Sequence, residues 1–347
     1  MEGLRRPPVI DKHDIRFTRL SVNGQSLQSR IKNIVQDDYG FLWFGTFDGL
    51  YRYDGYTLKP YRHERGNPNS VAADYVLALY KDLDGSLWIG FKFGGLDKLD
   101  PSRETITHYH HESDKPGSLT NDNVNCIYRD RSGNLWVGTA GGLERFDASS
   151  ETFIHYRHNP QDDKSLSSNT VLCVYEDRRR SLWVGTAWGL DRLERDTGRF
   201  SRFLHDPMNP HSIGHNYVNF MLEDRSGILW LSSPLGSGLN AFDVRTGEFT
   251  RYSFHAEEPS DQSVVGVNKV FEDRDGALWL CTVDRGLLKL DRERKTFTRY
   301  VKEPGNPDSL PHNTVHELYE DAEGIMWVGT QSGTSKFSRE APAFVNY

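Results

Sequence analysis

Apolar positions along the chain fall into short runs that are separated by clusters of Gly, Asp, Asn, Pro and Ser. Within residues 169–205, β-branched and aromatic residues form four such runs, at residues 171–175, 182–184, 190–193 and 200–203. Short runs of this composition, bounded by turn residues, are typical of β-strands. No window long enough for a helix keeps an apolar period of 3.6 residues, so the pattern predicts strands only.

This four-strand unit recurs along almost the whole sequence, and each copy contains one Trp in the second run. The repeat tryptophans are Trp43, Trp88, Trp136, Trp183, Trp230, Trp279 and Trp327. A fixed period of 45 to 49 residues indicates a propeller, a solenoid or an array, and four short strands per repeat form the blade of a propeller. A closed ring also leaves no large unpaired end face. We therefore predict an all-β, seven-bladed β-propeller with four antiparallel strands per blade, spanning residues 1–347 as a single domain.

The first hairpin of each unit carries a fixed turn signal. An Asp stands six residues before each repeat Trp, and in six copies a Gly follows three residues after that Asp. Asp hydrogen-bonds its own turn, and Gly supplies a positive φ angle. The fourth copy departs from this pattern, with Arg180 in place of the Gly. The signal predicts a tight turn between the first and second strands of every blade.

The ring needs a strand from one terminus to close it. Residues 15–20 resemble the fourth strand of later repeats, such as residues 249–252 and 297–300, yet they precede the first repeat. We expect residues 15–20 to be the outer strand of the seventh blade, beside residues 335–338. The tail from Phe344 to Tyr347 fits the same position and is the alternative.

Composition narrows the function classes. The net charge is −7 and no basic run is present, which argues against nucleic acid as a partner. No apolar stretch approaches the ~20 residues needed to span a bilayer, and the first residues lack the apolar core of a signal peptide. Cys126 and Cys173 occupy the same register in neighbouring repeats, where buried thiols are favoured over a disulfide.

Variation among the repeats points to one face of the disc. We label the four strands of each repeat A to D in sequence order. Strands alternate in direction, so the A–B and C–D turns lie on one face, here called the uniform face because its turn chemistry repeats. The B–C loops and the loops between blades lie on the other face, here called the variable face, where a ligand site is expected. The candidate ligand-binding residues are Trp188, Phe47, Asp48, Lys92, Phe93, Asp284, Arg285, His215 and His312.

Trp188 is the most distinctive of these residues, because other copies carry small or polar residues in its loop. Its ring is suited to stacking on a sugar or another flat ligand, but packing against an adjacent loop explains the position equally well. Phe47 and Phe93 are weaker versions of the same signal. The charged candidates can hydrogen-bond a ligand, although solvated loop charges are more common.

The histidines are discounted as metal ligands. His63, His111, His158 and His205 recur with the repeat, each two residues after the strand D aromatic, which favours a structural role. The run from His108 to His111 alternates along an outer strand and lacks an acidic partner at fixed spacing. No Ser–His–Asp order, Walker loop or His-Glu-x-x-His motif is found. We expect no metal and no cofactor.

Residues 41–55 and 133–139 resemble the repeat of the two-component regulator propeller family, and the resemblance covers residues 15–338. It implies the periplasmic sensor region of a hybrid histidine kinase, with an oligosaccharide or other small-molecule ligand. It also implies further domains of the same polypeptide, namely a second propeller and an immunoglobulin-like domain, and a homodimer of the full-length protein. The chain would be the N-terminal part of such a sensor. The family has no transferable ligand motif, so no site residue is carried over.

Three functions compete at this point. A non-catalytic ligand-sensing propeller leads. A lyase of polysaccharides or cyclic peptides is the alternative, since His215, Tyr217, His312 and Arg285 offer a base and a charge neutraliser. The third is a scaffold for protein interactions.

Overall fold

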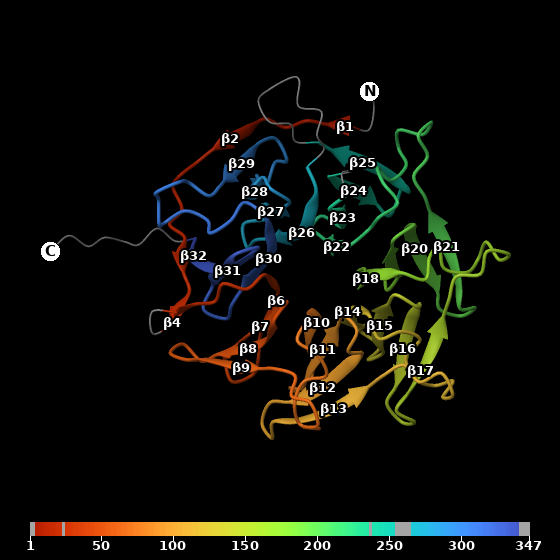
Figure 1. Cartoon of the computed structure of the whole chain (residues 1–347). Coiled ribbons are helices and arrows are strands. Elements are labelled where there is room, and N and C mark those ends of the chain that lie inside the picture. The colour runs from red at the N-terminus through yellow and green to blue at the C-terminus, as the bar shows by residue number, and fades with distance from the viewer. Residues whose placement is uncertain (1–3, 23–24, 236–237, 254–264, 340–347) are drawn as a thin grey trace.

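The computed structural model describes residues 4–22, 25–235, 238–253 and 265–339. Seven sheets stand around a common centre like the blades of a wheel, and the described residues contain no helix (Figure 1). In blades 1 to 6, strands A to D run from the centre outward in sequence order, each pairing antiparallel with the next. The predicted seven-bladed propeller is confirmed.

Each blade contains one copy of the repeat. Blades 1 and 2 consist of β6 (Ile31–Gln36), β7 (Leu42–Thr46), β8 (Gly49–Tyr53) and β9 (Leu58–Tyr61), then β10 (Val76–Lys81), β11 (Leu87–Phe91), β12 (Leu96–Asp100) and β13 (Thr105–Tyr109). Blades 3 and 4 consist of β14 (Val124–Arg129), β15 (Leu135–Thr139), β16 (Leu143–Asp147) and β17 (Thr152–Tyr156), then β18 (Val171–Glu176), β19 (Leu182–Thr186), β20 (Gly189–Glu194) and β21 (Arg199–Phe203).

The remaining three blades continue in the same order. Blades 5 and 6 consist of β22 (Phe220–Glu223), β23 (Ile228–Ser232), β24 (Leu239–Asp243) and β25 (Glu248–Tyr252), then β26 (Val267–Glu272), β27 (Leu278–Thr282), β28 (Leu287–Leu290) and β29 (Phe297–Tyr300). Blade 7 takes β30 (Val315–Glu320), β31 (Ile325–Thr330) and β32 (Gly333–Ser338) from the C-terminal repeat.

The N-terminal segment closes the ring. Strand β3 (Thr18–Arg19) pairs antiparallel with β32, with Thr18 opposite Lys336, and so supplies the outer strand of blade 7. The predicted closure by residues 15–20 is confirmed. The alternative at Phe344 to Tyr347 lies outside the described residues.

The same segment does more than the sequence indicated. Upstream of β3, β1 (Leu4–Arg5) and β2 (Val9–Asp11) add parallel fifth strands to the outer edges of blades 5 and 6, so the segment follows the rim past three blades (Figure 1). Downstream, β4 (Ser21–Val22) and β5 (Gln25–Ser26) form a two-stranded hairpin before blade 1.

A buried hydrogen bond repeats in all seven blades between the repeat Trp and the turn Asp. The indole Nε1 donates to the Asp Oδ2 at 2.7–2.9 Å, and every one of these tryptophans is at most 3% exposed. In blade 3, Asp130 Oδ1 also accepts the backbone N–H groups of Ser132 and Asn134, which shapes the A–B turn. The Asp therefore serves the turn, as predicted, and the core at once.

The turn needs a left-handed residue at its Gly position. Gly133 has φ 84°, and Arg180, which replaces the Gly in blade 4, adopts φ 69°. An L-residue with a side chain is uncommon in this region, so blade 4 keeps the same turn at a small energetic cost.

Blades pack closely where strand B carries Gly. A Cβ added to Gly138 would lie 2.4 Å from Cys126 Sγ and 2.6 Å from Val171 Cγ1 of the next blade. Aromatic edge-to-face contacts continue this packing outward, with Trp88 of blade 2 against Phe146 of blade 3 at a centroid distance of 5.4 Å. The core thus consists of six inter-blade layers and a seventh across the closure.

Replacing a repeat Trp removes both the buried ring and the donor that satisfies the Asp. Trp136→Ala and Trp279→Ala should each lower the free energy of unfolding by ~3–5 kcal/mol, measured by denaturant titration. Trp188→Ala is the matched control, because Trp188 is 63% exposed and should change stability by less than ~0.5 kcal/mol. Equal effects of the buried and exposed substitutions would contradict the packing role.

Closure by the N-terminal segment depends on Phe17, which is 2% exposed and packs edge-on against Tyr300 and Phe337. Phe17→Ala should cost ~3–5 kcal/mol of unfolding free energy. Ile10→Ala in β2, 51% exposed, should cost far less.

A chain starting at residue 14 should melt close to the full chain, whereas one starting at residue 24 exposes the edge of β32 and should melt much lower. Similar melting of the two truncated chains would refute closure by β3.

Candidate functional site

The inter-blade loops of the variable face are anchored from below by buried polar residues of strand C. Asp97, Glu144, Asp191 and Asn240 occupy the same position in blades 2 to 5 and are at most 2% exposed. Each accepts a backbone N–H from the preceding inter-blade loop, from Ala72, Thr120, Ser167 and Gly214 at 2.8, 3.2, 2.9 and 2.9 Å respectively. The loop backbones are therefore fixed while their side chains differ.

The repeated histidines have the structural role that the sequence predicted. The Nδ1 atoms of His63, His111, His158 and His205 lie 2.6–2.9 Å from backbone carbonyl oxygens of the same inter-blade loop. The expectation that the run at His108 lacks an acidic partner at fixed spacing is wrong. His108 pairs through Nδ1 with Asp97 at 2.6 Å, across strands C and D, and His155 pairs with Glu144 at the same spacing. Within the described ranges, no group of three or more His, Cys, Asp or Glu side chains is arranged to hold a metal ion.

His215 and His312 are occupied by their own loops. His215 Nδ1 accepts the backbone N–H of Tyr217, and His312 Nδ1 accepts that of Thr314, both at 2.9 Å. Asn121 and Ser168 make the equivalent contact in other loops. These two histidines therefore act as turn residues on the variable face.

The structure brings three of the sequence candidates together in blades 1 and 2. The Phe47 ring lies 3.9 Å, centroid to centroid, from Tyr75, and the guanidinium of Arg30 sits over Phe47 at 4.4 Å. Lys92 Nζ lies 5.1 Å from the Tyr75 ring centre and 5.3 Å from that of Phe93, which is 78% exposed. We call these five residues the aromatic row. Sequence reasoning missed Tyr75 and Arg30, whose only signal was a large side chain directly before an innermost strand.

The aromatic row continues into charged residues on the innermost strands of blades 1, 6 and 7. Lys269 Nζ forms an ion pair with Glu317, which is 2% exposed. Burial raises the pKa of Glu317, and its pairing with Lys269 opposes that shift. His316 Nε2 lies 3.0 Å from Gln331 Oε1, and burial lowers the pKa of His316 to about 4, so the ring is neutral at pH 7.

Lys32 of blade 1 joins this group. Burial lowers the pKa of its amine, Glu317 opposes that shift, and the nearby charges of Lys269 and Arg30 lower the pKa further. We call Arg30, Lys32, Lys269, His316 and Glu317 the central cluster. Sequence reasoning missed it because only the loops were compared between repeats.

Asp284 and Arg285 lie in the B–C loop of blade 6, the blade that carries Lys269 of the central cluster. Asp284 accepts a hydrogen bond from the Thr314 hydroxyl of the next inter-blade loop, and its φ of 61° places it in the left-handed region. Phe93 occupies the same region at φ 70°. Non-glycine residues held in this way cost energy and often occur at functional sites.

Asp48 lines a separate cavity of 640 Å³ at the rim of blade 1, together with Gln28, Ser29 and Tyr51. Asp48 Oδ2 lies 3.4 Å from Arg62 Nη2. Burial acts against ionisation of Asp48, but hydrogen bonds from Ser29 and Thr46 hold its pKa below the ordinary value. This cavity is polar and lies on the outer side of the blade.

Trp188 stands apart from the other candidates. It is 63% exposed in blade 4, and its backbone N–H donates to Thr186 Oγ1 at 3.0 Å. In the described part of the chain its ring has no aromatic or cationic neighbour, whereas Phe47, Lys92 and Phe93 share contacts in blades 1 and 2.

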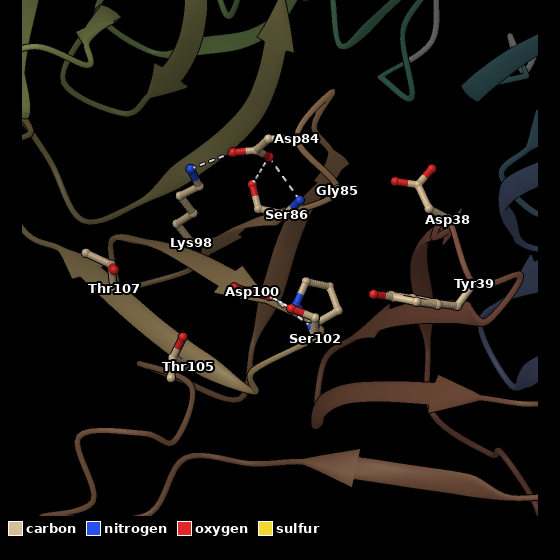
Figure 2. A pocket seen from close by; sticks show the side chains of 11 residues that line it. Asp38, Tyr39, Asp84, Gly85, Ser86, Lys98, Asp100, Ser102, Thr105 and Thr107 are labelled. Carbon is tan, nitrogen blue, oxygen red and sulfur yellow. Dashed lines mark hydrogen bonds and ion pairs between the residues drawn. The ribbon is translucent and has the colours of Figure 1, made fainter.

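A pocket of 380 Å³ opens on the uniform face between blades 1 and 2. Figure 2 shows Asp38 and Tyr39 on one side of it and Lys98 with Asp84 on the other. Asp84 already accepts hydrogen bonds from Lys98 at 2.9 Å and from Ser86. The carboxylate of Asp84 is thus already hydrogen-bonded within blade 2.

Two further observations concern the described residues as a whole. Cys126, Cys173 and Cys281 are all free thiols, and burial raises the pKa of Cys126 to about 12. No helix in the described ranges is long and apolar enough to cross a membrane.

Comparison with known families identifies the repeat. The family model described as "Two component regulator propeller" matches residues 25–48, 118–141, 165–188 and 309–332. Each matched segment covers the end of an inter-blade loop and the A–B hairpin. No curated protein matches the chain.

Solved structures share the fold at low sequence identity. One is the extracellular domain of a hybrid two component system from B. thetaiotaomicron, with TM-score 0.80 and 23% identity over 94% of this chain and 42% of that chain. A second extracellular domain from the same organism has a TM-score of 0.74 and 22% identity, over 95% of this chain and 40% of that chain. Virginiamycin B lyase from Staphylococcus aureus has a TM-score of 0.65 and 12% identity, over 93% of this chain and 98% of that chain. The chain spans about two fifths of the length of the two extracellular domains.

The anchor under the variable face should depend on pH through Asp191. Burial raises its pKa to about 6, above the unfolded value of ~3.9. The folded state therefore prefers the protonated acid, and its stabilisation is complete below pH ~4 and lost as the pH rises through 6. Between pH 7 and pH 5, wild type should gain about 1 kcal/mol of unfolding free energy relative to Asp191→Asn. Parallel pH profiles of the two proteins in denaturant titrations would contradict this role.

Proposed function

We propose that this chain, which belongs to the two-component regulator propeller family, is a non-catalytic ligand-sensing propeller in the periplasmic region of a two-component signalling protein. The repeats that match the family model support the signalling context. The extracellular domains that share its fold support the location outside the cytoplasm. The proposed ligand is an oligosaccharide.

The observation that carries this proposal is the aromatic row on the variable face. Sugar sites combine a flat aromatic surface, on which a ring stacks, with a few fixed polar groups around it. Phe93 offers an exposed ring, Lys92 flanks it, and Phe47 with Tyr75 extends the flat surface toward the centre of the disc. The buried anchors of strand C hold the loops of blade 2 in place before a ligand arrives, and a preformed site loses little entropy on binding.

The positions of the two variable-face histidines favour sensing over catalysis. A lyase needs a base that is free to take a proton and a neighbouring group that stabilises the negative charge. His215 and His312 each use Nδ1 to hold their own loop, and they belong to different inter-blade loops. The resemblance to virginiamycin B lyase, at 12% identity, is a likeness of fold.

Other parts of the same polypeptide belong to this proposal. Because the chain spans about two fifths of the two extracellular domains, we propose that a second propeller and an immunoglobulin-like domain share the binding and signalling roles, in a homodimeric full-length protein.

Calorimetric titration with a panel of neutral and acidic oligosaccharides tests the proposal. Phe93→Ala should weaken binding of a recognised oligosaccharide about two- to tenfold, because a stacked ring contributes about 0.5–1.5 kcal/mol. Tyr39→Ala is the control, since Tyr39 is 65% exposed on the uniform face and should leave the affinity unchanged.

The opposite pattern, with Tyr39→Ala weakening binding and Phe93→Ala not, would move the site to the uniform face. Trp188→Ala tells whether blade 4 contributes. Release of an unsaturated sugar from a uronic-acid polysaccharide would refute the non-catalytic function.

A further inference from the structure

At two neighbouring positions of the innermost strands, charged residues occur in only one sector of the disc. In each blade we compare the residue opposite the Gly position of strand B and the residue before it. Blades 2 to 5 carry only uncharged residues there, namely Leu77, Ala78, Asn125, Cys126, Leu172, Cys173, Asn219 and Phe220. The three consecutive blades 6, 7 and 1 carry Lys269, His316, Glu317 and Lys32.

The charges of this sector do not balance. Glu317 already forms an ion pair with Lys269. Lys32 has no hydrogen bond or ion pair to any described residue, and His316 is neutral because burial lowers its pKa to about 4. With Arg30 beside them, three basic side chains face one carboxylate, on a chain whose overall charge is −7.

The arrangement of Arg30 suits a hydrogen-bond acceptor that the described residues do not supply. Its guanidinium lies over the Phe47 ring, and its buried Nε has no hydrogen-bond partner among the residues that the structure describes. A guanidinium that stacks by its face leaves its N–H edge free, and that edge matches the two oxygens of a carboxylate or sulfate. A buried polar group without a partner is costly, so a bound anion would relieve that cost.

We infer that the sensed ligand carries an acidic group, a carboxylate or a sulfate, and that Arg30 and Lys32 bind it at the centre of the variable face. This inference rests on the proposed function and names the class of its ligand. The neutral part of the ligand extends outward over Phe47, Tyr75 and Phe93. Glu317, in blade 7, repels the anion toward Arg30 and Lys32 of blade 1. An uncharged oligosaccharide leaves both cations without an acceptor.

Lys32→Leu provides a test that needs no ligand. Leucine occupies the equivalent position in blades 2 and 4, as Leu77 and Leu172, so the scaffold accepts it. Without ligand, the variant should melt at a higher temperature than wild type, because a partly buried, unpaired charge has been removed. A lower melting temperature would mean that Lys32 is a structural partner of Glu317 and would overturn the inference.

Calorimetry of the full chain with three probes tests the ligand class. Oligogalacturonides supply carboxylates, sulfated chondroitin oligosaccharides supply sulfates together with carboxylates, and xylo-oligosaccharides are neutral. Wild type should bind at least one acidic probe, with an affinity that falls as salt rises. Lys32→Leu and Arg30→Gln should each weaken that binding at least tenfold. Lys98→Gln, at a lysine on the uniform face, is the control and should change nothing.

The outcomes separate this inference from the proposed function. A neutral probe that binds wild type, and is weakened by Phe93→Ala but not by Lys32→Leu, overturns the acidic ligand and keeps the sensing site. Acidic probes whose affinity is unchanged in folded Lys32→Leu and Arg30→Gln also overturn the inference. Weakening of acidic probes by both substitutions, with a higher melting temperature of Lys32→Leu, supports it.

Discussion

The fold depends on one buried hydrogen bond that is repeated around the ring, from the indole of each repeat Trp to the carboxylate of the turn Asp. A buried indole N–H without an acceptor is costly, and so is a buried carboxylate without donors. In each blade the two groups satisfy one another, and the same carboxylate also holds the A–B turn. A cation often completes the site: in blade 3, Arg195 Nη1 lies 2.7 Å from Asp130 Oδ2. Burial opposes ionisation there, but the bonds from Trp136 and Arg195 lower the pKa of Asp130 to about 2, so the acid stays charged at neutral pH.

This bond explains why the two faces of the disc differ. The Trp–Asp unit fixes the residues of the A–B turns, so the uniform face has little freedom to change without loss of core stability. The variable face is held differently, by side chains such as Asp97 and Asp191 that accept loop backbone N–H groups from beneath. Backbone anchoring places no demand on the loop side chains. The B–C loops join these inter-blade loops through backbone hydrogen bonds, such as those from Lys92 N–H to Tyr75 O and from Ala187 N–H to Thr170 O. The side chains of Phe93, Lys92 and Trp188 can therefore differ from blade to blade.

Much of the fold could be predicted because each repeat carries local sequence signals for its strands and turns. The Trp period gave the number of blades, and the motif around Phe17 gave the closing strand. The added strands β1 and β2 gave no signal, because two or three residues are too few to show alternation and their parallel partners lie more than 240 residues away. The site was harder for a related reason. Comparing loops singled out Phe47, Lys92 and Phe93. Contacts between segments that are separate in the sequence bring in Tyr75 and Arg30, and Lys32 is marked by charges on neighbouring strands. No local sequence pattern indicates such neighbours.

A repeat protein allows one further step, because its own copies show what the scaffold alone requires. Leu77 and Leu172 satisfy the innermost strands of blades 2 and 4, and the equivalent Lys32 in blade 1 brings a charge that lacks an acceptor. Local packing therefore does not account for the lysine. Departures that add stability, such as a better-filled core, need no other explanation. Departures that cost stability are expected where a binding partner returns the energy, and strained or unpaired groups cluster at functional sites for this reason. In this propeller the departures of that kind converge on the centre of the variable face, where Lys32 lies beside Arg30 of the aromatic row.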